Sequence, residues 1–167
     1  MPDAPNTSPA FIQTVGILGV PVDLTNQVCN PDNPGTTPLV AYDPLATYSE
    51  GNGVLVEMVD IQLTGTCVAT TVVMYYRLTL ETSPRWRKAA QRAIAPISYS
   101  TTVELPSYKM PLKDILSPVP GGGAFVGVPQ FTGLRLNSPT RNIQWGFALT
   151  VVSGTAPIIV TMYGGEY

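Results

Sequence analysis

Apolar and polar residues alternate with a period of two along several parts of this chain. The alternation is clearest in residues 69–81, ATTVVMYYRLTLE, which are rich in β-branched and aromatic types. This combination predicts a β-strand with one apolar face. That face consists of Val72, Met74, Tyr76, Leu78 and Leu80. Residues 54–63, VLVEMVDIQL, alternate over their second half, and the turn TGTC separates them from 69–81. We therefore expect these two segments to pair as an antiparallel hairpin or as neighbours in one sheet.

Shorter strands are predicted between segments that are rich in turn-forming residues. A final hairpin is expected from IQWGFALTVVS, residues 143–153, the turn GTAP, and IIVTMY, residues 158–163. The other candidates are residues 11–22, ended by Pro21, residues 39–48, residues 99–105 and residues 131–136. From the two clearest apolar faces we expect a core that includes Met74, Tyr76, Leu78, Trp145, Phe147 and Leu149.

Seven or eight strands with irregular connections predict an all-β protein, an antiparallel β-sandwich of the jelly-roll kind. No repeat or shift in composition marks a domain boundary, so residues 11–167 are expected to form one domain. Residues 1–10 are rich in Pro, Asn and Ser and are expected to form a flexible N-terminal arm. A long Pro- and Gly-rich connection covers residues 106–130, and loops of this length are usually functional or lie at a contact.

The segment RWRKAAQR, residues 85–92, holds four of the nine positive charges of the chain. Ser83 can cap a helix, and Pro84 suits its first turn. Trp86, three alanines and Ile94 follow one another at the spacing of one helix face. The pattern predicts one short amphipathic helix within residues 85–97, with Trp86 turned inward. The cations would face outward as candidate contacts to an acidic partner surface, with a solvated helix face as the alternative. These candidates are Arg85, Arg87, Lys88 and Arg92.

The composition limits the classes of partner. Charged residues make up 12% of the chain, about half the share in an ordinary soluble domain, and the net charge is −2. A net negative charge argues against nucleic-acid binding, which requires many Lys and Arg residues to neutralise phosphates. The apolar runs are too short to span a membrane, and MPDAPNTSPAFIQ at the N-terminus is not expected to act as an export signal. A surface built of Thr, Ser, Asn, Gly and Pro opposes contact between chains only weakly, which favours self-association.

Residues able to carry out catalysis are scarce. The chain has no histidine, which excludes His-based triads, the common zinc sites and imidazole general bases. Glu57 and Asp60 fall on opposite faces of a strand, and PGGGAFVG, residues 120–127, lacks the GKS or GKT ending of a phosphate loop. Cys29 and Cys67 are expected to be free thiols, although the sequence also allows a disulfide. We therefore expect no enzymatic activity, no catalytic residue, no metal site and no cofactor.

Two segments resemble a known group of proteins. TGTCVATTVVMYYR, residues 64–77, is similar to a hairpin followed by GTNVAT and an alternating strand. SGTAPIIVTMYGGEY, residues 153–167, resembles the ending GTTVAAGW, a strand and GGDY. Both patterns occur in this order in small β-proteins encoded among the structural genes of tailed bacteriophages, which include capsid decoration or cement proteins. This chain departs from the pattern at Cys67, where Asn is usual, at Ala156-Pro157, and in the insertion around RWRKAAQR.

The resemblance implies a bacteriophage virion structural protein. Its expected role is that of a capsid cement protein that bridges capsomers, binds the major capsid protein and itself forms a homo-oligomer, with a trimer as one candidate state. Such a protein is made in the host cytoplasm and becomes part of the virion. The alternative is a tail or baseplate module that binds host carbohydrate through exposed aromatic rings. The candidates for that role are Tyr75, Tyr99, Tyr108 and Trp145.

Overall fold

The computed structural model of the protein describes residues 14–43, 54–79, 82–102, 104–110, 112, 134–136 and 143–166. The predicted N-terminal arm and most of the predicted long connection lie outside these residues. The described part contains nine strands and no helix. The strands are β1 (Thr14–Leu24), β2 (Leu39–Tyr42), β3 (Val54–Leu63), β4 (Thr70–Leu78), β5 (Arg87–Ile94), β6 (Ser107–Lys109), β7 (Leu134–Leu136), β8 (Ile143–Leu149) and β9 (Ile158–Glu166).

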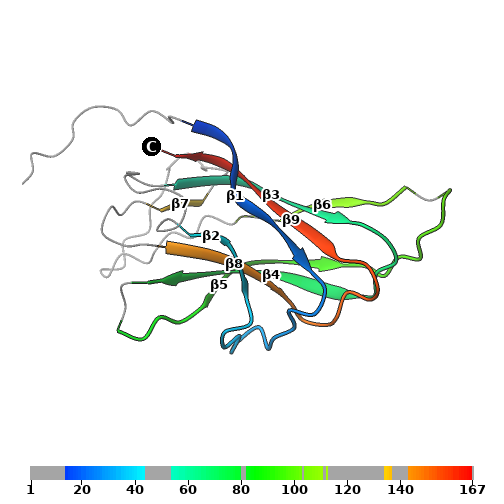
Figure 1. Cartoon of the computed structure of the whole chain (residues 1–167), viewed down its shortest axis with the longest axis horizontal. Helices are drawn as coiled ribbons and strands as arrows, with labels where there is room; N and C mark the ends of the chain where they lie inside the picture. Colours follow the sequence, from blue (N-terminus) through cyan, green and yellow to red (C-terminus); the bar gives the residue numbers. More distant parts are fainter. Residues whose placement is uncertain are drawn as a thin grey trace, which may run out of the picture.

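The strands form two antiparallel sheets that lie face to face (Figure 1). In sheet A the order is β1-β9-β3-β6, and β7 also pairs with β3. In sheet B the order is β2-β8-β4-β5. The predicted all-β class and the sandwich-like arrangement are confirmed by this architecture.

Two predicted pairings are wrong, because consecutive strands cross from one sheet to the other. β3 pairs with β9, β6 and β7 in sheet A, whereas β4 pairs with β5 and β8 in sheet B. The predicted final hairpin fails in the same way, since β8 belongs to sheet B and β9 to sheet A. Each of these strands has an apolar face, and two strands bury such faces against each other by facing across a core, not by lying side by side.

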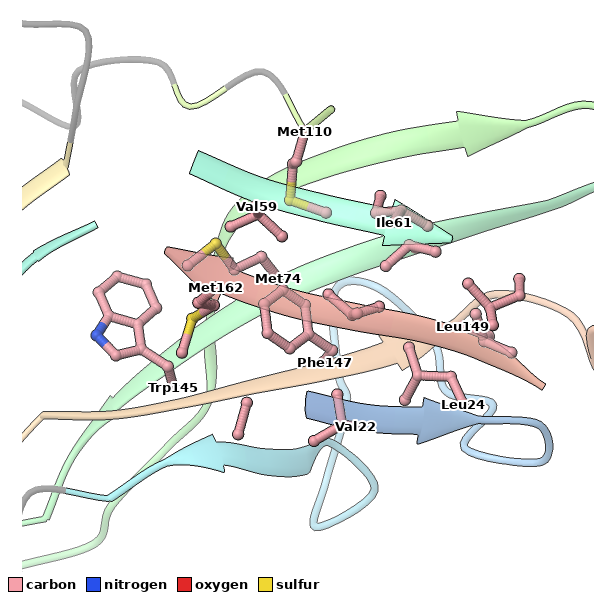
Figure 2. Packing of buried hydrophobic residues seen from close by; sticks show 14 of the residues in the cluster. Val22, Leu24, Val59, Ile61, Met74, Met110, Trp145, Phe147, Leu149 and Met162 are labelled. Atoms are coloured by element: carbon pink, nitrogen blue, oxygen red, sulfur yellow. The ribbon is translucent and has the colours of Figure 1, made fainter. Parts of the chain in front are cut away.

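The core lies between the sheets and contains apolar side chains from both (Figure 2). Val59 and Ile61 of β3 point toward Met74 of β4 and Phe147 of β8, and all four are fully buried. Of the six predicted core residues, Met74, Trp145, Phe147 and Leu149 are buried as expected. Tyr76 and Leu78 are only half-buried, because they lie at the C-terminal end of β4 near the rim of the sandwich.

A second apolar cluster covers the outer face of sheet B. Val73 and Tyr75 of β4 are fully buried there and pack with Trp86 and Ala148. Residues of the β1–β2 connection and of β2, including Cys29 and Val40, pack against the cluster. β4 is therefore buried on both of its faces, which the alternation of its sequence did not predict.

The predicted helix over residues 85–97 is wrong, because Arg87–Ile94 is strand β5 at the edge of sheet B. It pairs antiparallel with β4, from Thr70 opposite Ile94 to Tyr76 opposite Arg87, with one bulge. An isolated helix of this length is marginal in water, whereas the open edge of β4 supplies a row of hydrogen-bond partners. The prediction that Trp86 turns inward is confirmed, since this side chain is buried.

Two strand boundaries also differ from the prediction. β1 continues through Pro21 to Leu24, because Pro21 lies in a bulge between Leu18 and Val22 where it interrupts no ladder hydrogen bond. Residues 99–100 are irregular and residues 101–102 form a turn, and the strand expected in residues 99–105 begins only at Ser107.

Gly19 provides a test of this bulge. Its φ of 70° lies in the region that favours glycine, and an added Cβ would lie 2.1 Å from the carbonyl oxygen of Ala41 in β2. We expect Gly19→Ala to lower the free energy of unfolding by roughly 2–4 kcal/mol, measured by urea denaturation. Gly16→Ala on the same strand is the control, because an added Cβ there meets nothing within 4 Å. Equal stability of the two variants would contradict the close approach of β1 to β2.

Candidate functional site

Three connections at one end of the sandwich are joined by backbone hydrogen bonds. They are residues 64–69 between β3 and β4, residues 95–102 after β5, and residues 150–157 between β8 and β9. Cys67 lies at their centre, where its N–H and C=O exchange two hydrogen bonds of 2.9 Å with Ile97. On its other side Cys67 bridges Gly154, and the N–H of Val68 donates to the carbonyl of Ser153 over 3.0 Å. We call this group of three connections the arch surface.

Side-chain hydroxyls add further hydrogen bonds to the arch surface. Thr64 Oγ1 donates to the carbonyl of Pro157 over 2.6 Å, and Thr70 Oγ1 donates to that of Val151 over 2.8 Å. Within residues 150–157, Ser153 Oγ donates to the carbonyl of Ala156 over 2.8 Å. Because these bonds fix the backbone of each connection, the surface has a defined shape before any partner arrives.

The arch surface is apolar and carries no charge. It holds four of the large apolar side chains that are well exposed in the described part of the chain, at 42–49% of their full area. Residues 64–69, 95–102 and 150–157 include no Asp, Glu, Lys or Arg. Gathered exposed apolar groups with a polar, uncharged surround are typical of protein contact sites. The four residues are Val68, Tyr99, Val151 and Val152.

The two cysteines are free thiols, as expected from the sequence. Cys67 is buried, and its Sγ donates to the carbonyl of Val68 over 3.1 Å. Burial raises the pKa of the Cys67 thiol, because the charged thiolate would lose solvation. Cys67 is therefore a structural side chain at the centre of the arch surface and not a nucleophile.

This burial can be tested by alkylation. We expect iodoacetamide at pH 8 to modify half-buried Cys29 in the folded protein and to modify Cys67 only after opening, since Cys67 is inaccessible and its thiolate fraction is low. Mass spectrometry of peptides after timed quenching measures both rates, and the protein in urea serves as the control. Equal rates for the two thiols in the folded protein would contradict this arrangement.

The four cations of RWRKAAQR lie along one sheet edge and point in different directions. In the register between β5 and β4, Lys88 lies opposite Tyr75, which faces the outer side of sheet B. Arg92 lies opposite Val72, which faces the core. Lys88 Nζ lies 3.8 Å from Asp32, and the Arg92 guanidinium lies 5.6 Å from the centre of the Tyr108 ring of β6. Arg87 is exposed and has an interaction within the chain, and Arg85 is exposed just before the strand.

These positions give the cluster a structural role. β5 is an edge strand, and edge strands expose backbone groups to which another chain can pair. Long charged side chains and bulges are the common means of blocking such pairing, and β5 has both, with the bulge opposite Met74 and Tyr75. The cluster of cations that the sequence analysis assigned to a helix face is thus placed where charges protect an edge strand.

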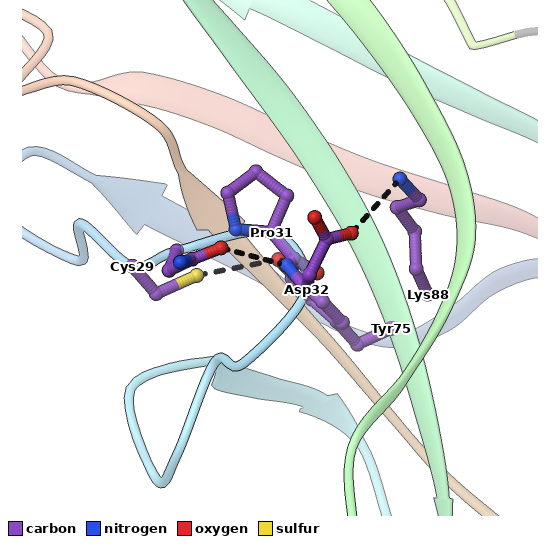
Figure 3. Close-up of polar contacts among 6 residues, drawn as sticks. Cys29, Pro31, Asp32, Tyr75 and Lys88 are labelled. Atoms are coloured by element: carbon purple, nitrogen blue, oxygen red, sulfur yellow. Dashed lines mark hydrogen bonds and ion pairs between the residues drawn. The ribbon is translucent and has the colours of Figure 1, made fainter.

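A polar contact joins the β1–β2 connection to the outer face of sheet B (Figure 3). The Tyr75 hydroxyl lies 3.3 Å from Cys29 Sγ and 3.5 Å from the carbonyl oxygen of Pro31. Burial, followed by the contact with Cys29, raises the pKa of the Tyr75 phenol. With the ion pair of Lys88 and Asp32 beside it, this contact fixes residues 29–32 over the sheet.

A second polar contact lies next to this one on the same face, around Arg77, two residues after Tyr75 in β4. The Arg77 guanidinium lies 4.6 Å from the centre of the Trp86 ring, which fits a cation–π contact, and its Nε donates to Gln144 Oε1. Gln144 in turn donates from Nε2 to Asp43 over 2.5 Å. Every charge or amide here has an internal partner, so the contact holds Trp86 in place.

The aromatic residues proposed for carbohydrate binding are largely inaccessible. Tyr75 and Trp145 are fully buried, so neither ring can stack on a sugar. The Tyr108 ring is half-buried under Arg92. Of the four proposed rings, Tyr99 on the arch surface is the exposed ring. The structure does not bring the four rings together on one face.

The described part of the chain offers neither a metal site nor a membrane-spanning helix. The described residues contain no group of three or more Cys, Asp or Glu side chains that could hold a metal ion. They also contain no helix long and apolar enough to cross a membrane. No family model, no curated protein and no solved structure matches this chain.

The role of the cation cluster can be decided by neutralising it. We expect the variant Arg85→Gln, Lys88→Gln, Arg92→Gln to keep its fold but to aggregate more readily, because β5 loses the charges that oppose edge pairing. Circular dichroism checks the fold and light scattering checks aggregation. The sequence hypothesis of an acidic partner surface requires a different result: the variant should attach to that partner more weakly than the wild type, and the difference should be larger at low salt than at high salt. Equal attachment of the variant and the wild type across a salt series would exclude that hypothesis.

Proposed function

We propose that the protein is a structural component of a bacteriophage virion, a capsid cement protein that binds the major capsid protein and bridges capsomers. The strand order supports this proposal. β1-β9-β3-β6 facing β2-β8-β4-β5 is the order expected of a jelly roll, in which the connections β1–β2, β3–β4, β5–β6 and β8–β9 each cross from one sheet to the other. Double-sheet jelly rolls occur in viral capsid domains and in lectins.

The observation that carries the proposal is the arch surface. It combines exposed Val68, Tyr99, Val151 and Val152 with a complete lack of charge over three hydrogen-bonded connections. Burying apolar area contributes about 25 cal/mol per Å², and this contribution does not depend on salt. A surface of this kind fits a permanent contact with a protein lattice better than a transient contact that is steered by charge.

Attachment in many copies fits the size of this surface. A single contact over three short connections is small, but a homo-oligomer that presents several arch surfaces to neighbouring capsomers binds with much higher avidity. Such a protein resists separation of the capsomers without any catalytic group. The proposed location is the virion, after synthesis in the host cytoplasm.

The second candidate, a tail or baseplate module that binds carbohydrate, has less support. Two of its four proposed rings, Tyr75 and Trp145, are in the interior. Sugar-binding sites generally combine an exposed ring with several polar groups that converge on the ligand. Tyr99 instead lies among Val68, Val151 and Val152, which offer no such groups.

The test uses capsids assembled from the major capsid protein of the phage that encodes this chain. We expect the protein at micromolar concentration to sediment with these particles, and Val68→Asp with Val151→Asp to reduce binding at least about tenfold, because each charge would be desolvated at the contact. The matched control, Thr82→Asp with Ser83→Asp, adds the same charge to exposed residues of the β4–β5 connection and should bind normally.

Two outcomes would overturn this proposal. One is a wild-type protein that stays in the supernatant at micromolar concentration. The other is equal binding by the arch variant and by its charge-matched control. Binding that falls steeply with added salt would also place the contact on a charged surface and not on the arch surface.

A further inference from the structure

The edges of the two sheets differ sharply in charge. Edge strand β5 carries Arg87, Lys88 and Arg92 together with a bulge, and edge strand β6 is three residues long and includes Lys109. Edge strand β1 is eleven residues long, and its first nine residues, TVGILGVPV, have no charge. In the described part of the chain, residues 14–18 of β1 are therefore an edge segment that has neither the charges nor the bulge that usually protect an edge against pairing with another strand.

β1 also exposes apolar side chains. Ile17 and Val20 are 51% and 59% exposed. Ile17 pairs with Tyr163 of β9, which pairs in turn with Met58 of β3. These three side chains form an apolar row that crosses the outer face of sheet A and ends at the edge with its most exposed member.

The bulge in β1 confines the open edge to the first half of the strand. Gly19 approaches the carbonyl of Ala41 so closely that no side chain fits between them. β1 bends at this point, as Figure 1 shows, and after the bulge it continues beside β9, from Val22 opposite Val160 to Leu24 opposite Ile158. Residues 14–18 pair with β9 along one side, and no strand of the described part of the chain pairs with their other side.

We propose that residues 14–18 of β1 pair with the same residues of a second copy, antiparallel about a two-fold axis, so that two copies of sheet A form one continuous sheet. This inference rests on the homo-oligomer of the proposed function and names the strand that builds it. Addition of a strand at a sheet edge is an established mode of association, and a two-fold axis pairs one patch with itself.

Charge and pattern favour a second copy as the occupant. An uncharged strand meets its own copy without like-charge repulsion, whereas a charged partner strand would gain no complementary contact there. A two-fold axis perpendicular to the sheet keeps the outer faces of both copies on the same side. The Ile17 side chains of the two copies then lie on one face, and the rows that contain Tyr163 and Met58 join across the interface.

The mass in solution tests this pairing. We expect light scattering coupled to size exclusion to give about twice 17.8 kDa for the wild type at tens of micromolar. Ile17→Lys and, separately, Ile17→Glu should weaken dimerisation at least about tenfold, because charges on edge strands oppose pairing. Gln62→Lys is the control, since it adds the same charge to an exposed residue of β3 within sheet A. A wild-type monomer, or dimerisation unchanged in both β1 variants, would overturn the proposal.

Hydrogen exchange provides a measurement without substitutions. Backbone amides of residues 14–18 should exchange more slowly at a concentration that favours the dimer than at a tenfold lower concentration. Amides of β5, the protected edge, should exchange equally at both concentrations. Slower exchange in β5, or no change in β1, would count against pairing through β1 even if a dimer forms.

The two proposals fail separately. Loss of dimerisation in Ile17→Lys with retained binding of single copies to capsids would leave the arch contact standing. A stable dimer that does not bind to capsids would support the β1 pairing and exclude the cement function. Val68→Asp with Val151→Asp should keep the dimer, since these residues lie on the arch surface, near the C-terminal end of β1 and not beside residues 14–18.

Discussion

The sandwich depends on backbone hydrogen bonds that join its crossovers at one end. Cys67 exchanges two such bonds with Ile97 and bridges Gly154, so the connections after β3, β5 and β8 are fixed to one another. The β1–β2 connection joins the same system through bonds between Cys29, Gln27 and Leu149. Each crossover transfers the chain from one sheet to the other. Fixing the crossovers together therefore fixes which strands face each other over the core, and buried Cys67 fills the space at their centre.

The distribution of charge follows from the same arrangement. The three crossovers of the arch surface carry no charged residues, whereas edge strand β5 carries three of the nine cations of the chain. Lys88 pairs with Asp32 and Arg92 covers Tyr108, so the cations also fasten the open side of the sandwich. The result is a protein with a protected edge at β5, an apolar arch surface and an uncharged edge at β1. A component that packs into a larger assembly needs this combination, because each contact surface must attract one partner without promoting indiscriminate pairing.

The outer face of sheet B shows how the protein closes a surface that is not meant for contact. Val73 and Tyr75 would be exposed on a bare sheet, but the β1–β2 connection and Trp86 cover them. Arg77 holds Trp86 from one side and Cys29 meets Tyr75 from the other. The Tyr75 ring, which the sequence suggested for ligand binding, is therefore used for packing. The arch surface and the edge at β1 remain as accessible apolar areas for partners.

The sequence by itself determined the all-β class, most of the strands, one apolar face of the clearest strands and the absence of charge in the connections. These features are local, because alternation and turn-forming residues act within a few positions along the chain. Only the tertiary structure decided that β3 and β4 lie in different sheets, that β8 and β9 do likewise, and that Arg87–Ile94 is an edge strand and not a helix. Alternation shows which face of a strand is buried, but the choice of partner depends on backbone edges and covering segments that are distant in sequence. For the same reason the arch surface could not be predicted, since it exists only where three separate crossovers are hydrogen-bonded side by side.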